Sequence, residues 1–349
     1  MLMLFNDVKP VMRFQPWKHP YLPRKILAIR FQALGDTVVS LPYLQSLKRQ
    51  FPEIELHFIT KKEVCDIPKN IHLFDKVFIL KGGRSARLQF LFVLLKLPSL
   101  IWQSYDAVLD LQNNRISILL RKLLWVKAWS EFDKYSPLPA GERMKLAIEA
   151  LGGWKISLDT NFKLDINIEG LLSVNNWKKD HDIVLLNPAG CFSSRSWPLS
   201  YYVEFAKLWI KHINVSTQFL LLLLPAHKEK ADFISRSLKD KCIDLTGKAN
   251  QLEAFAILQK CKFVLSEDSG LMHMAWIQKI PTLALFSSSK RVWSAPQGKW
   301  SICLDSSDME CGPCMKEVCK YNDNRCLTRF TPEFVLARAI PLIRNLNLL

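Results

Sequence analysis

Short apolar runs alternate along the chain with longer stretches in which apolar residues recur every three or four positions. The run at 25–30 is typical of a buried parallel strand. It leads into residues 37–50, where Val38, Leu41 and Leu44 share one helical face. In the first half, this pattern predicts strands at 25–30, 55–59, 76–80 and 106–110, and helices at 37–50 and 87–103.

The same alternation restarts after a polar stretch at 165–180. It predicts strands at 183–186, 219–224, 263–266 and 282–286, and helices at 199–213, 228–239, 252–259 and 271–278. Thr331 is a good N-cap residue, and the proline that follows it suits the first position of a helix. We therefore expect a terminal helix from this point.

Strands that alternate with helices predict an α/β fold with parallel sheets. The 349 residues exceed the roughly 250–300 at which one core stops growing. We expect two Rossmann-like lobes, residues 1–172 and 173–349, whose parallel sheets face each other across a cleft. The last helix is a candidate to pack back on the first lobe. Ligands of such sheets bind at the carboxyl ends of the strands.

The balance of charge narrows the choice of partners. There are 48 Lys and Arg against 32 Asp and Glu, a formal charge of +16, which attracts anionic partners such as phosphorylated substrates, anionic lipid or nucleic acid. The basic residues are scattered, and most are typical of solvated helix faces. No helix-turn-helix or aromatic-basic motif is present, so we expect no nucleic-acid partner.

Two stretches bear on location. The first 23 residues contain Asp7 and several prolines before any apolar run of signal length, so we expect a cytoplasmic protein. The apolar stretch 88–102 contains Lys96 and Pro98 and is shorter than the about 20 residues of a membrane span. A buried helix is the simpler interpretation. An interfacial helix on the cytoplasmic face of the inner membrane is the alternative.

Three strand-to-helix turns carry candidate chemistry. In the first, Gly35 allows a tight bend or a close approach to a ligand, and Thr37 belongs to the same loop. Asp36 is then at the carboxyl edge of the sheet, where it can act as a general base or as a simple helix N-cap.

The other two turns are in the second half. One contains Gly190, Ser193, Ser194 and Arg195, which can offer open backbone N–H groups and a bidentate guanidinium to phosphate, or form an ordinary serine-rich loop. The other contains Asp268, Ser269, Gly270 and His273. Its helix N-terminus suits a pyrophosphate, whereas a capping Asp-Ser pair and a core histidine are the structural alternative.

These motifs together resemble glycosyltransferase family nine, the ADP-heptose:lipopolysaccharide heptosyltransferases. The resemblance runs in order from about residue 25 to the C-terminus. It rests on ILAIRFQALGDTVVSLP at 26–42, NPAG at 187–190 with RSWP at 195–198, LTGK at 245–248, EDSGLMHMA at 267–275 and PTLALF at 281–286.

The resemblance implies a GT-B fold, with an acceptor-binding first lobe, a donor-binding second lobe and no required metal or other cofactor. It also implies an inverting transfer of heptose or a related sugar from an ADP-sugar to a lipopolysaccharide core or other phosphorylated or lipid-linked envelope glycan. Asp36 would match the family's base, and Arg195 its basic residue near the diphosphate. Asp268, Ser269, Gly270 and His273 would match its nucleotide-sugar contacts.

Some residues depart from the family pattern. Phe286 is followed by three serines where the family often has Gly-Pro-Thr, which changes the pocket at that point. The loop before Glu229 lacks the usual glycines, so Glu229 is carried over as a candidate ribose contact only.

Nine cysteines without an export signal argue against a disulfide scaffold. Four of them, Cys311, Cys314, Cys319 and Cys326, form C-x2-C-x4-C-x6-C. Four thiolates can hold a structural zinc, but a second C-x2-C pair is absent, which favours reduced thiols that stabilise a loop.

Two rival functions remain from the sequence. A nucleotide-sugar-binding scaffold without catalysis is disfavoured by the intact Asp36. A basic nucleic-acid-binding protein is supported by the net charge alone.

Overall fold

The computed structural model describes residues 12–83, 85–190 and 192–346. The chain divides into two compact units, Met1–Asp159 and Thr160–Leu349. The division falls earlier than the 172/173 boundary taken from the polar stretch, and α6 (Glu169–Ser173) belongs to the second unit.

The first unit contains one six-stranded sheet in the order β1-β6-β5-β2-β3-β4. All neighbouring pairs are parallel except β1 and β6, which are antiparallel. The strands are β1 (Phe14–Gln15), β2 (Lys25–Ile29), β3 (Glu55–Lys61), β4 (Lys76–Leu80), β5 (Ala107–Asp110) and β6 (Ala128–Glu131). Nearly every residue of β2 and β5 is buried, which is why these strands appear in the sequence as continuous apolar runs.

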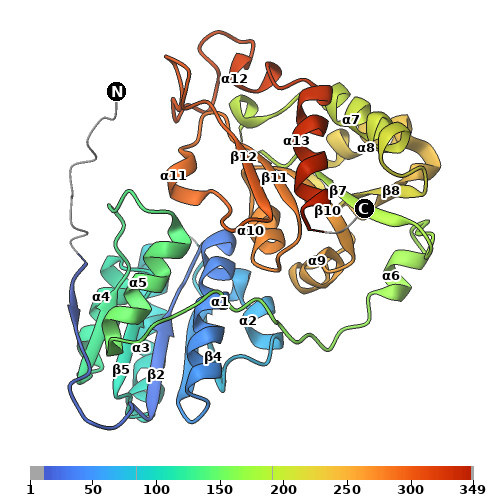
Figure 1. Cartoon of the computed structure of the whole chain (residues 1–349). Helices are drawn as coiled ribbons and strands as arrows, with labels where there is room; N and C mark the ends of the chain where they lie inside the picture. The colour runs from blue at the N-terminus through green and yellow to red at the C-terminus, as the bar shows by residue number, and fades with distance from the viewer. Residues whose placement is uncertain (1–11, 84, 191, 347–349) are drawn as a thin grey trace. The chain divides into compact units, whose positions relative to one another are not determined.

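The helices of this unit are α1 (Leu34–Gln50), α2 (Asp66–Asn70), α3 (Ala86–Ile101), α4 (Arg115–Leu123) and α5 (Ala140–Gly152), with a 3-10 turn at Lys62–Val64. Helices α1 to α4 connect successive strands, and α5 follows the last strand, β6 (Figure 1). Val93 and Leu100 of α3 and Leu120 of α4 pack into one core with β2 and β5. The rest of α3 is largely exposed, so the simpler expectation of a buried helix at 88–102 is wrong.

The second unit contains a six-stranded parallel sheet in the order β12-β11-β10-β7-β8-β9. Its strands are β7 (Asp182–Asn187), β8 (Thr217–Leu221), β9 (Cys242–Asp244), β10 (Cys261–Glu267), β11 (Thr282–Leu285) and β12 (Ser301–Leu304). Strand order reverses between β7 and β10, just as it does between β2 and β5 in the first unit. Such switch points are where α/β sheets bind ligands.

The helices of the second unit are α6, α7 (Leu199–His212), α8 (Lys228–Leu238), α9 (Gln251–Leu258), α10 (Gly270–Trp276), α11 (Arg291–Ser294), α12 (Arg325–Thr328) and α13 (Pro332–Arg344). Thr331 caps α13, because its hydroxyl accepts the N–H of Phe334 at 3.3 Å. Val335 and Ala339 of α13 join the core that contains Trp197 and Phe205. The last helix is therefore anchored in its own unit, whereas the sequence left packing on the first lobe open.

Every strand and helix predicted above is present, and the expectation of two parallel-sheet α/β domains is confirmed. The pattern missed short or amphiphilic elements such as β1, β6, β9 and β12. No helix of the described residues has both the length and the apolarity to cross a membrane.

Candidate functional site

Asp36 is the third residue of α1, in the first turn after β2. Its Oδ2 lies 2.5 Å from Nη2 of Arg30 and accepts the N–H of Ala33 at 3.4 Å. The helix starts three residues earlier than predicted, so Asp36 lies within its first turn and not before it. The carboxylate nevertheless remains 42% exposed, so one residue both caps the helix and presents an oxygen to solvent.

Two buried arginines surround this carboxylate. Arg30 directly follows β2, donates to the carbonyl of Leu111, and lies over the ring of Phe132 at 5.4 Å. Arg143 of α5 lies over the same ring at 4.7 Å. Burial lowers the pKa of Arg143, and the negative charge of Asp36 opposes that shift. Both arginines were missed from the sequence, although the position of Arg30 at the end of a buried strand was a usable signal.

The two neighbours of Asp36 have different surroundings. Gly35 is the second residue of α1 and is absent from the described residues with positive φ, so it makes no left-handed turn. Thr37 is fully buried, and its hydroxyl donates to the carbonyl of Ala33 at 2.9 Å. Thr37 is thus part of the helix and not of a loop, because its side chain satisfies the backbone of the first turn.

In the second unit, Glu267 ends β10 at the switch point and is completely buried. Its carboxylate accepts the backbone N–H of Gly190 at 2.5 Å and that of Trp197 at 2.7 Å. Burial raises the pKa of Glu267 to about 7, although these donors and the charge of Lys230 oppose the shift. Glu267 therefore fastens both ends of the 190–197 loop to the sheet.

The backbone at position 190 packs so closely on Arg195 and Glu267 that only glycine fits there. A Cβ there would lie 2.3 Å from the carbonyl oxygen of Arg195 and 2.6 Å from Oε2 of Glu267. Neither atom can move freely, since one is backbone and the other belongs to a carboxylate whose two oxygens each accept a backbone N–H.

Arg195 and Asp268 are brought together from separate turns. Nη1 of Arg195 lies 3.6 Å from Oδ2 of Asp268, and Nε donates to the hydroxyl of Ser288 at 3.3 Å. Both side chains retain some exposure, 17% for the arginine and 15% for the aspartate. A cation held by a carboxylate and a hydroxyl at a sheet's carboxyl edge can bind an anionic ligand group.

The expectation of open backbone N–H groups in this loop is wrong for most of the loop. The N–H of Gly190 donates to Glu267, that of Ser194 to the carbonyl of Glu317, and that of Arg195 to the carbonyl of Phe192. The loop folds as a 3-10 turn, Ser193–Arg195, which uses its own donors. The positive charge available to a ligand therefore comes from the Arg195 side chain.

A segment more than a hundred residues later supports this turn. The Ser193 hydroxyl donates to the carbonyl of Glu317, and the Ser194 hydroxyl donates to that of Lys316. The Ser194 hydroxyl also lies 3.1 Å from that of Ser288. Ser194 is buried, so we assign it a supporting place and not a ligand contact.

The third turn is organised around Ser269, the N-cap of α10, whose hydroxyl accepts the N–H of Met272 at 3.4 Å. Gly270 starts the helix, which spans only seven residues and has a correspondingly weak dipole. His273 is 9% exposed, and its Nδ1 accepts the indole N–H of Trp276 at 3.1 Å. This arrangement matches the core-histidine alternative.

Glu229 lies in the first turn of α8 and is exposed. Among the described residues, no hydrogen bond or ion pair joins it to the other candidate residues. Its neighbour Lys230 was missed from the sequence, yet its ammonium donates to the carbonyl of Pro188 at 3.0 Å and to the hydroxyl of Ser196 at 3.2 Å. Lys230 thus fixes the loop that carries Arg195.

Buried polar atoms without partners mark the same sheet edge. Within the described residues, Oδ1 of Asn187 and the hydroxyls of Ser287 and Ser289 have no hydrogen-bond partner, and all three residues are over nine-tenths buried. Asn187 is the last residue of β7, and Ser287 and Ser289 follow the end of β11. A buried polar atom costs free energy unless it is satisfied, so these three atoms indicate a place where a polar ligand completes the structure.

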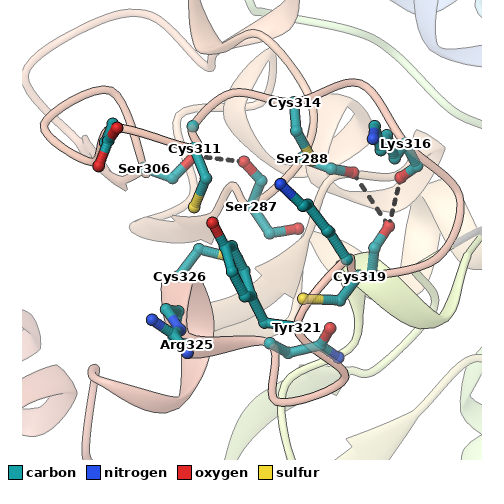
Figure 2. Close-up of a pocket in the computed structure, with 15 residues that line it drawn as sticks. Ser287, Ser288, Ser306, Cys311, Cys314, Lys316, Cys319, Tyr321, Arg325 and Cys326 are labelled. Carbon is teal, nitrogen blue, oxygen red and sulfur yellow. Dashed lines mark hydrogen bonds between the residues drawn. The ribbon is translucent and has the colours of Figure 1, made fainter.

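The four late cysteines line one cavity of about 320 Å³ with Ser194, Ser288 and Tyr321 (Figure 2). All four are free thiols. Burial and the neighbouring cysteines raise the pKa of Cys326 to about 11. Burial also acts on Cys319, but backbone N–H groups at 321–324 outweigh it and lower the pKa of that thiol. Across residues 12–83, 85–190 and 192–346, no three His, Cys, Asp or Glu side chains are placed to hold a metal ion.

Comparisons with known proteins agree with this geometry. The model of glycosyltransferase family 9 (heptosyltransferase) matches residues 144–324. Lipooligosaccharide heptosyltransferase 2 of Campylobacter jejuni is 24% identical over 330 residues, which cover 90% of this chain and 97% of that protein.

Solved structures give the same result. A family 9 glycosyltransferase of Veillonella parvula superposes with a TM-score of 0.74 at 18% identity, over 92% of this chain and 97% of that one. The E. coli heptosyltransferase WaaC with ADP-2-deoxy-2-fluoro heptose gives 0.63 at 18% identity, over 91% and 99%. These likenesses confirm the expected GT-B fold.

Proposed function

Because this chain belongs to glycosyltransferase family 9, the heptosyltransferases, we propose that it transfers heptose from an ADP-sugar to a lipopolysaccharide core or a related envelope glycan. It is a glycosyltransferase that uses a nucleotide sugar. The relative from C. jejuni is named for lipooligosaccharide, and the WaaC structure contains an ADP-heptose analogue, which supports both the donor and the acceptor class.

The observation that carries this proposal is the arrangement at the β7/β10 switch point. Arg195 supplies the cation for the donor diphosphate, held in place by Asp268 and Ser288. The unpartnered oxygens of Asn187 and Ser287 supply hydrogen-bonding positions for the rest of the nucleotide sugar. Asp268, Ser269, Gly270 and His273, together with Gly190, Ser193 and Ser194, stay proposed donor-site residues, most of them through support of Arg195. Glu229 stays a proposed ribose contact.

Asp36 is the proposed general base. Its carboxylate takes the proton of an acceptor hydroxyl while that oxygen forms a bond to the anomeric carbon of the donor. The bond from the anomeric carbon to the diphosphate oxygen breaks, and its electron pair leaves with ADP. A single displacement of this kind inverts the configuration of the sugar. Arg30 positions the carboxylate through its ion pair.

The leaving group is proposed to need no metal ion. A developing diphosphate charge can be stabilised by preorganised cations, and Arg195 is such a cation. Transfer that continues unchanged in excess EDTA is the expected result, and transfer that stops in EDTA and returns with one divalent metal would contradict the proposal.

Replacing Asp36 by Asn tests the proposed function. A general base contributes about 10²- to 10⁴-fold, so kcat should fall by that factor in a coupled assay of ADP release with lipid-free core acceptor. ADP affinity measured by calorimetry should not change. Asp165→Asn, at an exposed position of the second unit, is the matched control. ADP-heptose binding with no turnover in the wild-type protein would instead identify a donor-binding scaffold.

A further inference from the structure

Helix α3 (Ala86–Ile101) presents an unusually apolar face to solvent. Its exposed large apolar residues, with the following tryptophan, are Leu88, Phe90, Leu91, Leu94, Leu95, Ile101 and Trp102. Leu95 is 66% exposed and Trp102 is 85% exposed. Several large apolar side chains exposed on one helix mark an interaction site.

The helix faces two environments. Gln89, Val93 and Leu100 point into the unit and are buried. Leu88, Leu91, Leu95 and Trp102 recur at spacings of three, four and seven residues, which places them along one outer stripe of the helix. The apolar stripe is therefore additional to the face that packs on the core.

A basic cavity adjoins this stripe. It has a volume of about 760 Å³ and is lined by Phe92, Leu95 and Ser99 of α3 together with four lysines. Lys62 belongs to the 3-10 turn, Lys69 to α2 and Lys96 to α3, and the fourth, Lys81, directly follows β4. All four are exposed, and Asp66 is the acidic residue that lines the cavity with them. Within the described chain no carboxylate forms an ion pair with any of the four.

We propose that α3 and this lysine-lined cavity dock on an anionic lipid bilayer. The apolar stripe enters the boundary between headgroups and acyl chains, and the four ammonium groups bind lipid phosphates beside it. An interfacial helix combines an apolar face with adjacent lysines in this way. The inference deepens the proposed function, because a transferase that acts on a lipid-linked acceptor must reach the surface in which that acceptor is anchored.

Vesicle co-sedimentation tests the surface directly. The full-length protein should sediment with vesicles of phosphatidylcholine and phosphatidylglycerol at low salt and release as salt rises. It should bind pure phosphatidylcholine vesicles at least tenfold more weakly. Equal binding to both, or none to the anionic vesicles, overturns the proposal. Inorganic phosphate at matched ionic strength should not displace the protein, and specific displacement would identify a site for free phosphate instead.

Variants separate the two parts of the surface. Lys69→Gln with Lys96→Gln should weaken anionic-vesicle binding about 30-fold, since each lysine near such a surface contributes about fivefold. Leu91→Ser with Leu95→Ser should weaken anionic-vesicle binding by about tenfold or more for each leucine side chain that enters the bilayer in the wild type.

Matched controls lie in the second unit at exposed positions. They are Lys211→Gln with Lys260→Gln, and Val174→Ser with Val215→Ser. Equal losses in control and α3 variants would refute the assignment of the surface. Transfer to a detergent-dispersed acceptor should be unchanged in the α3 variants. Absence of that transfer in every protein, with vesicle binding intact, would refute the proposed function and leave the docking surface standing.

Discussion

The buried Glu267 leads to a prediction that the stability of the second unit falls as pH rises. Its pKa is raised from 4.5 to about 7 in the folded protein, chiefly by burial. The folded state therefore holds a proton that the unfolded state has already released above pH 4.5. Stability from this group is fully present below that value and is lost as pH rises through about 7.

The size of the effect follows from the two pKa values. One pKa unit corresponds to about 1.4 kcal/mol. Ionisation of Glu267 between pH 5 and pH 8 should therefore lower the free energy of unfolding by about 2–3 kcal/mol. Glu267 is completely buried, so solvent does not screen this term.

Glu267→Gln isolates the titration. The amide is neutral, like the protonated acid, but its NH2 group cannot accept a hydrogen bond, so one of the two N–H groups of Gly190 and Trp197 loses its acceptor. We therefore expect the variant to be less stable than the wild type at pH 5 by about 1–3 kcal/mol. Between pH 5 and pH 8 the stability of the variant relative to the wild type should rise by about 2–3 kcal/mol.

Urea unfolding from pH 5 to pH 8, followed by tryptophan fluorescence, measures this difference. Trp197 is fully buried next to Glu267 and reports on the second unit. The difference in unfolding free energy between variant and wild type cancels the contributions of the titrating groups that both proteins share. A difference that stays constant over this range would refute the reasoning, because it would mean that Glu267 is ionised throughout.

Three further predictions concern the 190–197 loop and the cysteine-lined cavity beside it. Gly190→Ala should destabilise the protein by about 2–4 kcal/mol through its clash with backbone, whereas Gly170→Ala, whose Cβ meets nothing within 4 Å, should be neutral in the same urea assay. Arg195→Lys should weaken ADP binding about 10- to 100-fold in calorimetry, since a lysine cannot make the bidentate contact; unchanged affinity would remove Arg195 from the donor site. Iodoacetamide at pH 7.5 should modify Cys319 before Cys326, because their pKa values are shifted in opposite directions, and peptide mapping that finds the reverse order would contradict this.

The sequence predicted the layout of the fold because buried parallel strands are continuous apolar runs. It assigned Arg195 and Asp268 to one donor-binding lobe through the family resemblance, and the structure pairs them because they follow the neighbouring strands β7 and β10. Short strands such as β6 and β12 were missed because four residues of mixed character give no clear period.

The supporting residues of the site could not be predicted from local pattern. Glu267 binds Gly190 and Trp197 across roughly 70 residues of chain, and nothing near Glu267 in the sequence indicates those partners. Thr37 was assigned both to the loop motif and to the start of the helix at 37–50, and the bond from its hydroxyl to the carbonyl of Ala33 places it in the helix.

The support of the Ser193–Arg195 turn by residues 316–324 has a consequence for synthesis on the ribosome. All six strands of the second sheet have been translated by Leu304. The carbonyls of Lys316 and Glu317 and the amide of Asn324, which hold the turn, emerge only afterwards, as does the Phe330 carbonyl that accepts from Trp197. A nascent chain can thus complete the sheet before its arginine has a fixed position, so the proposed nucleotide site is complete only after Phe330 has been translated.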